Sequence, residues 1–577
     1  MKKKYYLAVW LFYFLVSLVL TYPLAFTYHR YPLFDHLEIT VTFYNLWWQY
    51  YSLFHLKSSL WFNPLINYPD GYSMVFFPLF LSYGIFSSLL QAVFSTKALV
   101  GYLNWLWILS FAFSGFLGFL LFSQLSGSRK AGLICGICFS FLPFHYWHLP
   151  RLHISCLELL LLAVLAYFYF LGKKSLWSGI LLGLSLVFLG YQSPNYLVYL
   201  FIFFALHFFY LVIFFRGAVD RLWLKAVSLA GGLFLVLLSP YLWQMVKDLA
   251  YQSTPVLSTI REQTRFSANL LGFFLPGEGE RFYQSLACLS KSWITTGIDG
   301  KEIFPGYLLL VSGILGMILA RRYIKHYGFW LVAFWCFLLL SLGPYLNFAR
   351  HTYYSLPLPF YFLRKVLPFL EMERSPVRWA IISFLCLAVF SAGFFRYLEE
   401  KLSERRNWIF WLFGLFALLE LNQAPIKTDR INLPEFYQRL CSKKGEFSLL
   451  ELPLLPDIYR YVGFYQVWHH KPLVIDLTAR RVGAGLRDSP LLYYLDEPKR
   501  FFQLSEKKKE KVLEEIQAEQ KRRKVGYIIL WLRFMEKEKA QRLDELIKLL
   551  SPVGIERISD LFWIYQFKEA GNGKGGG

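Results

Sequence analysis

The stretch from Leu99 to Phe122, LVGYLNWLWILSFAFSGFLGFLLF, contains no charged residue and is long enough to cross the hydrocarbon core of a membrane as a helix. Comparable apolar runs recur through the first three quarters of the 577-residue chain, which is 56% hydrophobic and 20% aromatic. This pattern is typical of a polytopic α-helical membrane protein. The first run, residues 1–26, has a basic start but no small-residue cleavage site, so we expect a retained helix.

Short basic loops separate the apolar runs and predict their orientation. These loops are residues 126–132, 172–175, 216–225, 321–328 and 399–407. We place them and the N-terminus in the cytoplasm, which explains much of the formal net charge of +22 without a nucleic-acid partner. This orientation requires residues 75–95 to form a shallow or re-entrant element on the outer side, because a further crossing there would invert every later loop. The sequence therefore predicts about 11 spans in a multi-pass protein of the plasma membrane.

The composition changes abruptly after residue 424. Residues 425–577 combine amphipathic charged helices at 503–524 and 535–550 with short apolar strands. The strands are expected within residues 445–454, 471–477, 525–534 and 561–567. We therefore expect a transmembrane domain at 1–424, with a first external loop at about 26–99, and a soluble extracytoplasmic α/β domain at 425–577.

Two acids, Asp35 and Glu38, follow the first apolar run in the sequence PLFDHLE. On a helix they would share one face, because they are three residues apart. One interpretation is that they cap a short interfacial helix. The other is a functional site, since an ionised carboxylate near lipid requires water, a cation or a substrate.

Aromatic and turn-forming residues continue this first loop. Trp47 and Trp48 suit either a membrane interface or the binding of an acceptor or sugar. Asp70 lies in YPDGY, where it is either a turn former or a further sugar ligand.

Three parts of the chain resemble the GT-C class of integral-membrane glycosyltransferases, in particular its uncharacterised bacterial members. They are the first loop through WFNPLINYPDGYS, the segment PFHYWHLPRLHISCLELLLLAVLAYFYFL, and the segment LPLPFYFLRKVLPFLEMERSPVRWAIISFLCLAVFSAG. Members of this class take a sugar from a polyprenyl-phosphate or polyprenyl-diphosphate carrier and hold an essential acid in the first external loop. Several branches pair two acids as DxD, a pattern that is absent here. Its absence disfavours a divalent metal and favours Asp35 alone as the essential acid of the loop, so no cofactor is assigned.

The resemblance implies inversion at the anomeric carbon. Asp35 would be the catalytic base that takes the proton of an acceptor hydroxyl, with Glu38 as a second acid. The departing phosphate requires cations, and the candidates are Arg374 and Arg378 in MERSPVRW and Arg151 and His153 in HLPRLHIS. The ordinary interpretation of Arg374 and Arg378 is an anchor to lipid headgroups, and that of His153 is a hydrogen-bonded histidine at a helix start.

We therefore expect a glycosyltransferase that moves a hexosyl or pentosyl group from a lipid-linked donor to a glycan, lipid or protein acceptor at the outer membrane face, in cell-envelope glycan synthesis. A transporter or flippase of lipid-linked saccharide is the first alternative, although the two halves show no convincing repeat. A noncatalytic assembly factor with a transferase fold is the second.

Overall fold

The computed structural model describes residues 2–27, 29–32, 36–215, 220–251, 257–295, 303–402, 406–430, 433–475, 489–558 and 561–568. The chain divides into two compact units, each assembled from segments that are distant in sequence. The first unit is Met1–Asp35 with Phe80–Arg430, and the second is His36–Leu79 with Ile431–Gly577. Residues 36–79 of the predicted first loop thus belong to the same compact unit as the C-terminal segment.

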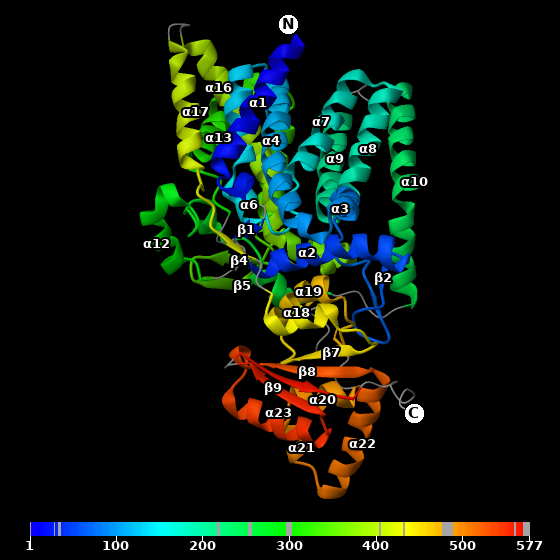
Figure 1. Cartoon of the computed structure of the whole chain (residues 1–577). Helices are drawn as coiled ribbons and strands as arrows, with labels where there is room; N and C mark the ends of the chain where they lie inside the picture. The colour runs from blue at the N-terminus through cyan, green and yellow to red at the C-terminus, as the bar shows by residue number, and fades with distance from the viewer. Residues whose placement is uncertain are drawn as a thin grey trace. The chain divides into compact units, whose positions relative to one another are not determined.

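The first unit is a bundle of apolar helices (Figure 1). These are α1 (Lys2–Leu20), α4 (Leu99–Ser126), α5 (Arg129–Ser140), α7 (Leu157–Lys173), α8 (Leu176–Gln192), α9 (Pro194–Phe214), α10 (Arg221–Tyr251), α13 (Tyr307–Leu319), α14 (Tyr327–Ser341), α16 (Ala380–Lys401) and α17 (Trp408–Glu420). Among the described residues, five helices are long and apolar enough to cross a membrane. The structure is therefore that of a helical membrane protein, and the figure of about 11 spans stays a prediction.

Glycines allow several of these helices to pack backbone against backbone. A Cβ atom on Gly316 of α13 would lie 2.0 Å from the carbonyl oxygen of Phe390 on α16. A Cβ atom on Gly179 of α8 would lie 2.5 Å from the carbonyl oxygen of Ala226 on α10. Close contact through small residues is typical of helices in membranes, where dispersion forces rather than water exclusion drive packing.

Helix α3 (Leu81–Phe94) occupies the segment predicted not to span. Its 14 residues extend about 21 Å, less than the roughly 30 Å of a hydrocarbon core. The Ser82 hydroxyl donates a hydrogen bond to the Phe188 carbonyl of α8 at 2.7 Å, and the Tyr102 hydroxyl of α4 donates to the Tyr83 carbonyl at 2.7 Å. The length and these contacts agree with a short helix held against the bundle.

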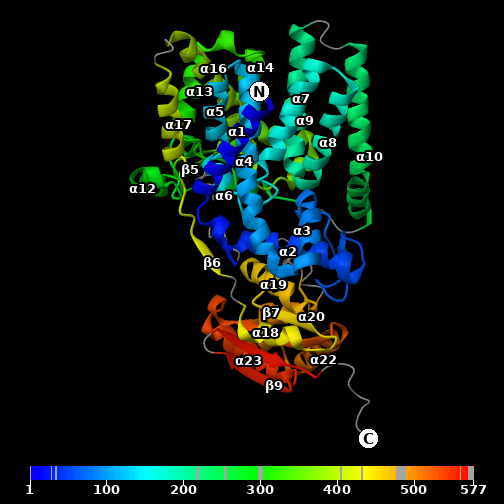
Figure 2. The ribbon, with the colours of Figure 1, turned by 45° about the horizontal axis from the view of Figure 1, so that its top comes forward.

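Shorter elements gather at the end of the bundle where α4 and α7 begin, as Figures 1 and 2 show. They are η1 (Leu24–Phe26), β1 (Arg30–Pro32), α6 (Pro143–Trp147), α11 (Ile260–Arg265), η4 (Leu270–Phe273), η5 (Arg281–Tyr283), α12 (Gln284–Trp293), β4 (Tyr345–Phe348), β5 (His351–Pro357), α15 (Pro359–Val366), η8 (Pro368–Met372), η9 (Pro376–Trp379) and β6 (Thr428–Arg430). β4 and β5 form an antiparallel hairpin, and β1 pairs antiparallel with β6.

The second unit contains a four-stranded sheet of order β7-β8-β10-β9. β7 (Ser448–Leu452) and β8 (Val525–Trp531) are parallel and fully buried, whereas β10 (Phe562–Gln566) is antiparallel to both β8 and β9 (Gly554–Ile558). Its helices are α18 (Glu435–Ser442), α19 (Pro456–His469), α20 (Pro490–Asp496), α21 (Lys499–Phe502), α22 (Glu506–Arg522) and α23 (Lys537–Leu549). The sequence did not predict β9, and of the strand expected at 471–477 the described part forms only a bridge between Leu473 and Leu449.

Helix α2 (His36–Tyr50), followed by the π-helical turn Tyr51–Leu56, packs against α19 in this unit. The rings of Phe43 and Phe464 meet edge to face, with centroids 5.6 Å apart. After α2, the short strands β2 (Phe62–Asn63) and β3 (Tyr72–Ser73) pair antiparallel. Between them, the Leu65 carbonyl accepts a hydrogen bond from the Leu473 amide at 2.7 Å. Segments about 400 residues apart therefore share one hydrophobic core.

Candidate functional site

Asp35, the predicted catalytic base, lies outside the described residues, so its role stays a prediction. Glu38 lies in the first turn of α2, where a negative charge interacts favourably with the helix N-terminus. Its Oε1 atom is 3.1 Å from Nη2 of Arg460 on α19, and about a fifth of each side chain is exposed. The structure therefore gives Glu38 a positively charged partner within its own unit.

Trp47 and Trp48, predicted to bind an acceptor or sugar, are fully buried in the second unit. The Trp47 ring stacks on His470 at 5.5 Å, and Trp48 Nε1 donates to the Leu60 carbonyl at 2.9 Å. Stacking on a sugar requires an exposed aromatic face, and neither ring has one here. The aromatic run that suggested an interface is instead covered because α19 packs over it.

Asp70 occupies a tight turn. Its amide and that of Gly71 donate to the Asn67 carbonyl at 3.0 and 3.1 Å, and Gly71 has a φ of +74°, which favours glycine. The Asp70 carboxylate is 3.4 Å from Nη1 of Arg522, and both side chains are half exposed. These contacts support the turn-forming interpretation rather than ligand binding.

The segment His148–Cys156 joins α6 to α7 and carries two of the predicted phosphate ligands. Its backbone is held by side chains of the surrounding helices. Gln192 donates to the Leu152 carbonyl at 3.1 Å, Ser110 donates to the Ser155 carbonyl at 3.1 Å, and Tyr196 donates to the Ile154 carbonyl. Because three helices fix the carbonyls of this loop, its side chains are held on a rigid support.

Arg151 and Arg378 of the first unit both act electrostatically on His153, and both also act on His148. Burial, followed by the positive charges of Arg378 and Arg151, lowers the pKa of His153 well below its usual range. Burial, followed by Arg151, also lowers the pKa of His148 well below its usual range, and Arg378 adds to this. Both imidazoles are therefore neutral at physiological pH beside two permanently charged guanidinium groups. His148 precedes Arg151 in the motif HLPRLH, but its sequence context alone did not single it out.

The two histidines also retain hydrogen-bonding capacity. Nδ1 of His153 and Nε2 of His148 are buried, and neither has a hydrogen-bond partner among the described residues. The Phe80 ring stacks on His153 at 5.8 Å and covers one of its faces. Buried polar atoms without partners are unusual and costly in folded proteins, so they are candidates for contacts with a ligand.

Arg378 is positioned by Glu373. Its Nη1 atom is 4.0 Å from Glu373 Oε1, and 13% of the Arg378 side chain is exposed. The Glu373 carboxylate also accepts hydrogen bonds from the Tyr199 hydroxyl at 2.8 Å, from Asn195 at 3.1 Å and from the Ser375 amide at 3.2 Å. With four partners, this carboxylate is fixed, and it orients the guanidinium group that lies beside it.

Arg374 has different partners. Its Nε atom is 2.8 Å from Glu262 Oε1, and its guanidinium lies over the Phe266 ring at 4.4 Å. The Arg374 side chain is thus engaged by Glu262 and Phe266. The structure therefore brings together Arg151, His153 and Arg378, and it pairs Arg374 separately.

Within the described ranges, no group of three His, Cys, Asp or Glu side chains is arranged to hold a metal ion. The first-loop acid that a metal would require, Asp35, lies outside those ranges. The view that a divalent metal is disfavoured therefore stays a prediction.

Protein-family models and curated protein sequences show no match to this chain. Solved structures do show similarity. The archaeal oligosaccharyltransferase AglB from Archaeoglobus fulgidus, in complex with an inhibitory peptide and a dolichol-phosphate, matches with a TM-score of 0.55 and 14% identity over 94% of this chain and 71% of AglB. An oligosaccharyltransferase from Archaeoglobus fulgidus in its apo form matches with a TM-score of 0.55 and 14% identity over 95% of this chain and 72% of that protein.

A second similar structure is the arabinofuranosyltransferase AftD from Mycobacteria, with a TM-score of 0.55 and 12% identity over 98% of this chain and 42% of AftD. AglB and AftD are both GT-C membrane glycosyltransferases. This chain has the GT-C fold. The resemblance seen in three sequence segments is confirmed for the fold, which these neighbours share over nearly the whole chain.

Proposed function

We propose that this protein is a membrane glycosyltransferase that takes a sugar from a polyprenyl-phosphate or polyprenyl-diphosphate carrier and transfers it, with inversion, to an acceptor at the outer membrane face. The observation that supports this most directly is the cluster of Arg151, His153, His148 and Arg378 in a chain with the GT-C fold. Two guanidinium groups beside neutral imidazoles suit a phosphate, because they supply charge and donors together.

In this proposal, Asp35 takes the proton from the acceptor hydroxyl as that oxygen attacks the anomeric carbon. The bond between the anomeric carbon and the phosphate oxygen breaks, and its electron pair goes to the phosphate. Arg378 and Arg151 then stabilise the charge that accumulates on the leaving group. His153 donates a hydrogen bond to the phosphate without competing for a proton, since its pKa is low.

The proposal includes an orientation of the chain in the membrane. The basic loops and the N-terminus lie in the cytoplasm, and residues 425–577 lie outside it. Replacing Lys97, which lies just before α4, with cysteine tests this arrangement, because a membrane-impermeant thiol reagent added outside should label it. Labelling only from the cytoplasm would contradict the orientation.

The function is tested by transfer of labelled sugar from a panel of lipid-linked donors to membrane acceptors. Membranes expressing wild type, Asp35→Asn and Glu38→Gln are compared at matched expression and with matched monodispersity after extraction. We expect Asp35→Asn to abolish transfer, whereas Glu38→Gln, which weakens a partly exposed ion pair with Arg460, should retain most of it. Equal transfer by Asp35→Asn and wild type would remove Asp35 from the mechanism.

A further inference from the structure

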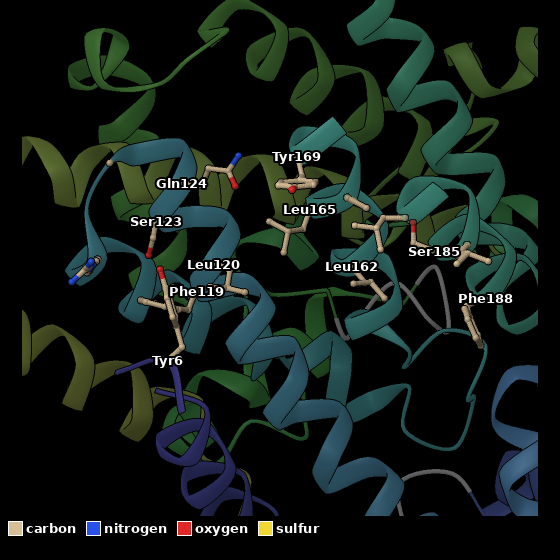
Figure 3. A pocket seen from close by; sticks show the side chains of 15 residues that line it. Tyr6, Phe119, Leu120, Ser123, Gln124, Leu162, Leu165, Tyr169, Ser185 and Phe188 are labelled. Atoms are coloured by element: carbon tan, nitrogen blue, oxygen red, sulfur yellow. The ribbon is translucent and has the colours of Figure 1, made fainter. Parts of the chain in front are cut away.

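A large apolar pocket lies within the bundle between two pairs of helices, with α1 and α4 on one side and α7 and α8 on the other. Its volume is about 880 Å³. Figure 3 shows Leu120 of α4 and Leu162 and Leu165 of α7 directed into the same space, with Phe188 of α8 at the far side. Leu162 and Phe188 remain 37% and 49% exposed, so the pocket is open at the side of the bundle. In a membrane, such an opening faces hydrocarbon rather than water.

Most of the polar side chains of the pocket gather at one end, whereas Ser185 lies in the middle of α8. Ser123 and Gln124 lie in the last turn of α4, Gly127 lies in the connection to α5, and Arg129 is the first residue of α5. This connection belongs to the basic loop 126–132, which our proposed orientation places at the cytoplasmic surface. The pocket therefore combines a long apolar body with a polar, cationic mouth.

Arg129 is the free cation at this mouth. The exposed guanidinium lies over the Tyr5 ring at 4.8 Å, and no carboxylate in the described parts of the chain forms an ion pair with it. Its neighbour Lys130, by contrast, is 3.2 Å from Glu399 and donates to Asn407 at 2.7 Å. The charge of Arg129 is thus available to an anion from outside the protein.

The dimensions fit one chain of a leaflet lipid. From Leu162 to Tyr169 the lining of α7 extends about 10 Å, which is about two thirds of the roughly 15 Å of one leaflet's hydrocarbon. Tyr169 is about 18 Å along α7 from Leu157, where the loop that carries Arg151 ends. A headgroup bound at Arg129 is therefore remote from the proposed transfer site.

We propose that this pocket binds one hydrocarbon chain of an anionic glycerophospholipid from the cytoplasmic leaflet, with the phosphate held by Arg129. The apolar walls accept the chain without desolvating polar groups, and the guanidinium pairs with the phosphate through charge-assisted hydrogen bonds. A glycerophospholipid is favoured over the sugar carrier because the cationic mouth lies at the opposite end of α7 from Arg151. The inference depends on the proposed orientation, but not on glycosyl transfer.

The test is native mass spectrometry of the delipidated full-length protein, titrated with phosphatidylglycerol, phosphatidylcholine and a polyprenyl phosphate. We expect wild type to bind one phosphatidylglycerol about five- to tenfold more tightly than phosphatidylcholine of the same chains. Arg129→Gln should remove that preference. Lys174→Gln is the matched control, because Lys174 lies in another basic loop, outside the pocket lining, and pairs with Asp220 at 2.8 Å.

A second variant tests the apolar body of the pocket. Leu162→Trp changes a partly exposed lining residue and should weaken both phospholipids while leaving the protein monodisperse. The proposal is overturned if wild type does not prefer phosphatidylglycerol, if Arg129→Gln keeps the preference, or if Leu162→Trp binds both lipids as wild type does. Tighter, Arg129-dependent binding of polyprenyl phosphate would also overturn it, by making the carrier the occupant.

Discussion

Replacing Arg378 with alanine should reduce sugar transfer far more than the same replacement at Arg374. The two arginines are four residues apart and would be equivalent by sequence alone. In the structure, Arg374 is 2.8 Å from Glu262 and stacks on Phe266, whereas Arg378 is 4.0 Å from Glu373 and acts electrostatically on His153. Of these two arginines, therefore, only Arg378 acts on the proposed phosphate site.

The expected size of the effect follows from the interaction that is lost. A hydrogen bond to a charged group contributes about 1.5–3 kcal/mol, so Arg378→Ala should lower kcat/KM by roughly ten- to a hundredfold. Arg374→Ala removes a partly exposed ion pair, which contributes about 0–1 kcal/mol, so its kcat/KM should fall less than about fivefold. Arg378→Lys should recover only part of the loss, because an ammonium group cannot make the planar two-pronged contact.

The pH profile gives an independent readout. In wild type, burial, Arg378 and Arg151 lower the pKa of His153 well below its usual range, so His153 is neutral at neutral pH. Removing the Arg378 charge should raise the pKa of His153, although burial, the largest cause, and Arg151 still hold it below its usual range. The acid side of the pH profile of Arg378→Ala should therefore shift to higher pH than in wild type, measured as kcat/KM with a lipid-linked donor.

Two results would refute this reasoning. Equal losses in Arg378→Ala and Arg374→Ala would show that the structural difference between the arginines does not matter for transfer. An unchanged pH profile in Arg378→Ala would show that Arg378 does not control the ionisation of His153. Extraction yield and monodispersity of both variants, matched to wild type, are the controls for folding.

Three further predictions concern stability and positioning. Burial raises the pKa of the fully buried Glu451 carboxylate from 4.5 to about 7, so the protonated carboxyl stabilises the fold fully below pH 4.5, and this stabilisation is lost as the pH rises through 7. The unfolding free energy of Glu451→Gln minus that of wild type should therefore increase by about 3 kcal/mol between pH 4.5 and 8, and an unchanged difference would contradict this reasoning. Gly316→Val should prevent close packing against the Phe390 backbone and lower the thermal midpoint by several degrees in detergent. A midpoint like that of wild type would show that α13 and α16 can move apart without loss of stability. Arg460→Met should leave the thermal midpoint within a few degrees and, like Glu38→Gln, retain most transfer, because a partly exposed ion pair contributes only about 0–1 kcal/mol; loss of most transfer would show that this ion pair is required.

Local signals in the sequence were sufficient for the class of fold. The apolar run at Leu99–Phe122 predicts a membrane helix, and α4 occupies Leu99–Ser126. The amphipathic pattern at 503–524 predicts a helix, and α22 occupies Glu506–Arg522. Such patterns depend on neighbouring residues within one element, so they can be recognised without knowledge of the rest of the chain. The GT-C resemblance rested on loose loop motifs, and the solved structures confirm it for the fold.

Contacts between distant segments could not be predicted in this way. The sequence alone assigned Trp47 either to a membrane interface or to the binding of an acceptor or sugar, whereas in the structure it is buried against the end of α19, some 400 residues later. It also treated Arg374 and Arg378 alike, and only the positions of Glu262 and Glu373 distinguish them. Hydropathy and periodicity determine which segments become helices in a membrane, because each helix satisfies its own backbone hydrogen bonds. Which side chains meet is decided by packing between elements, and that information exists only in the tertiary structure.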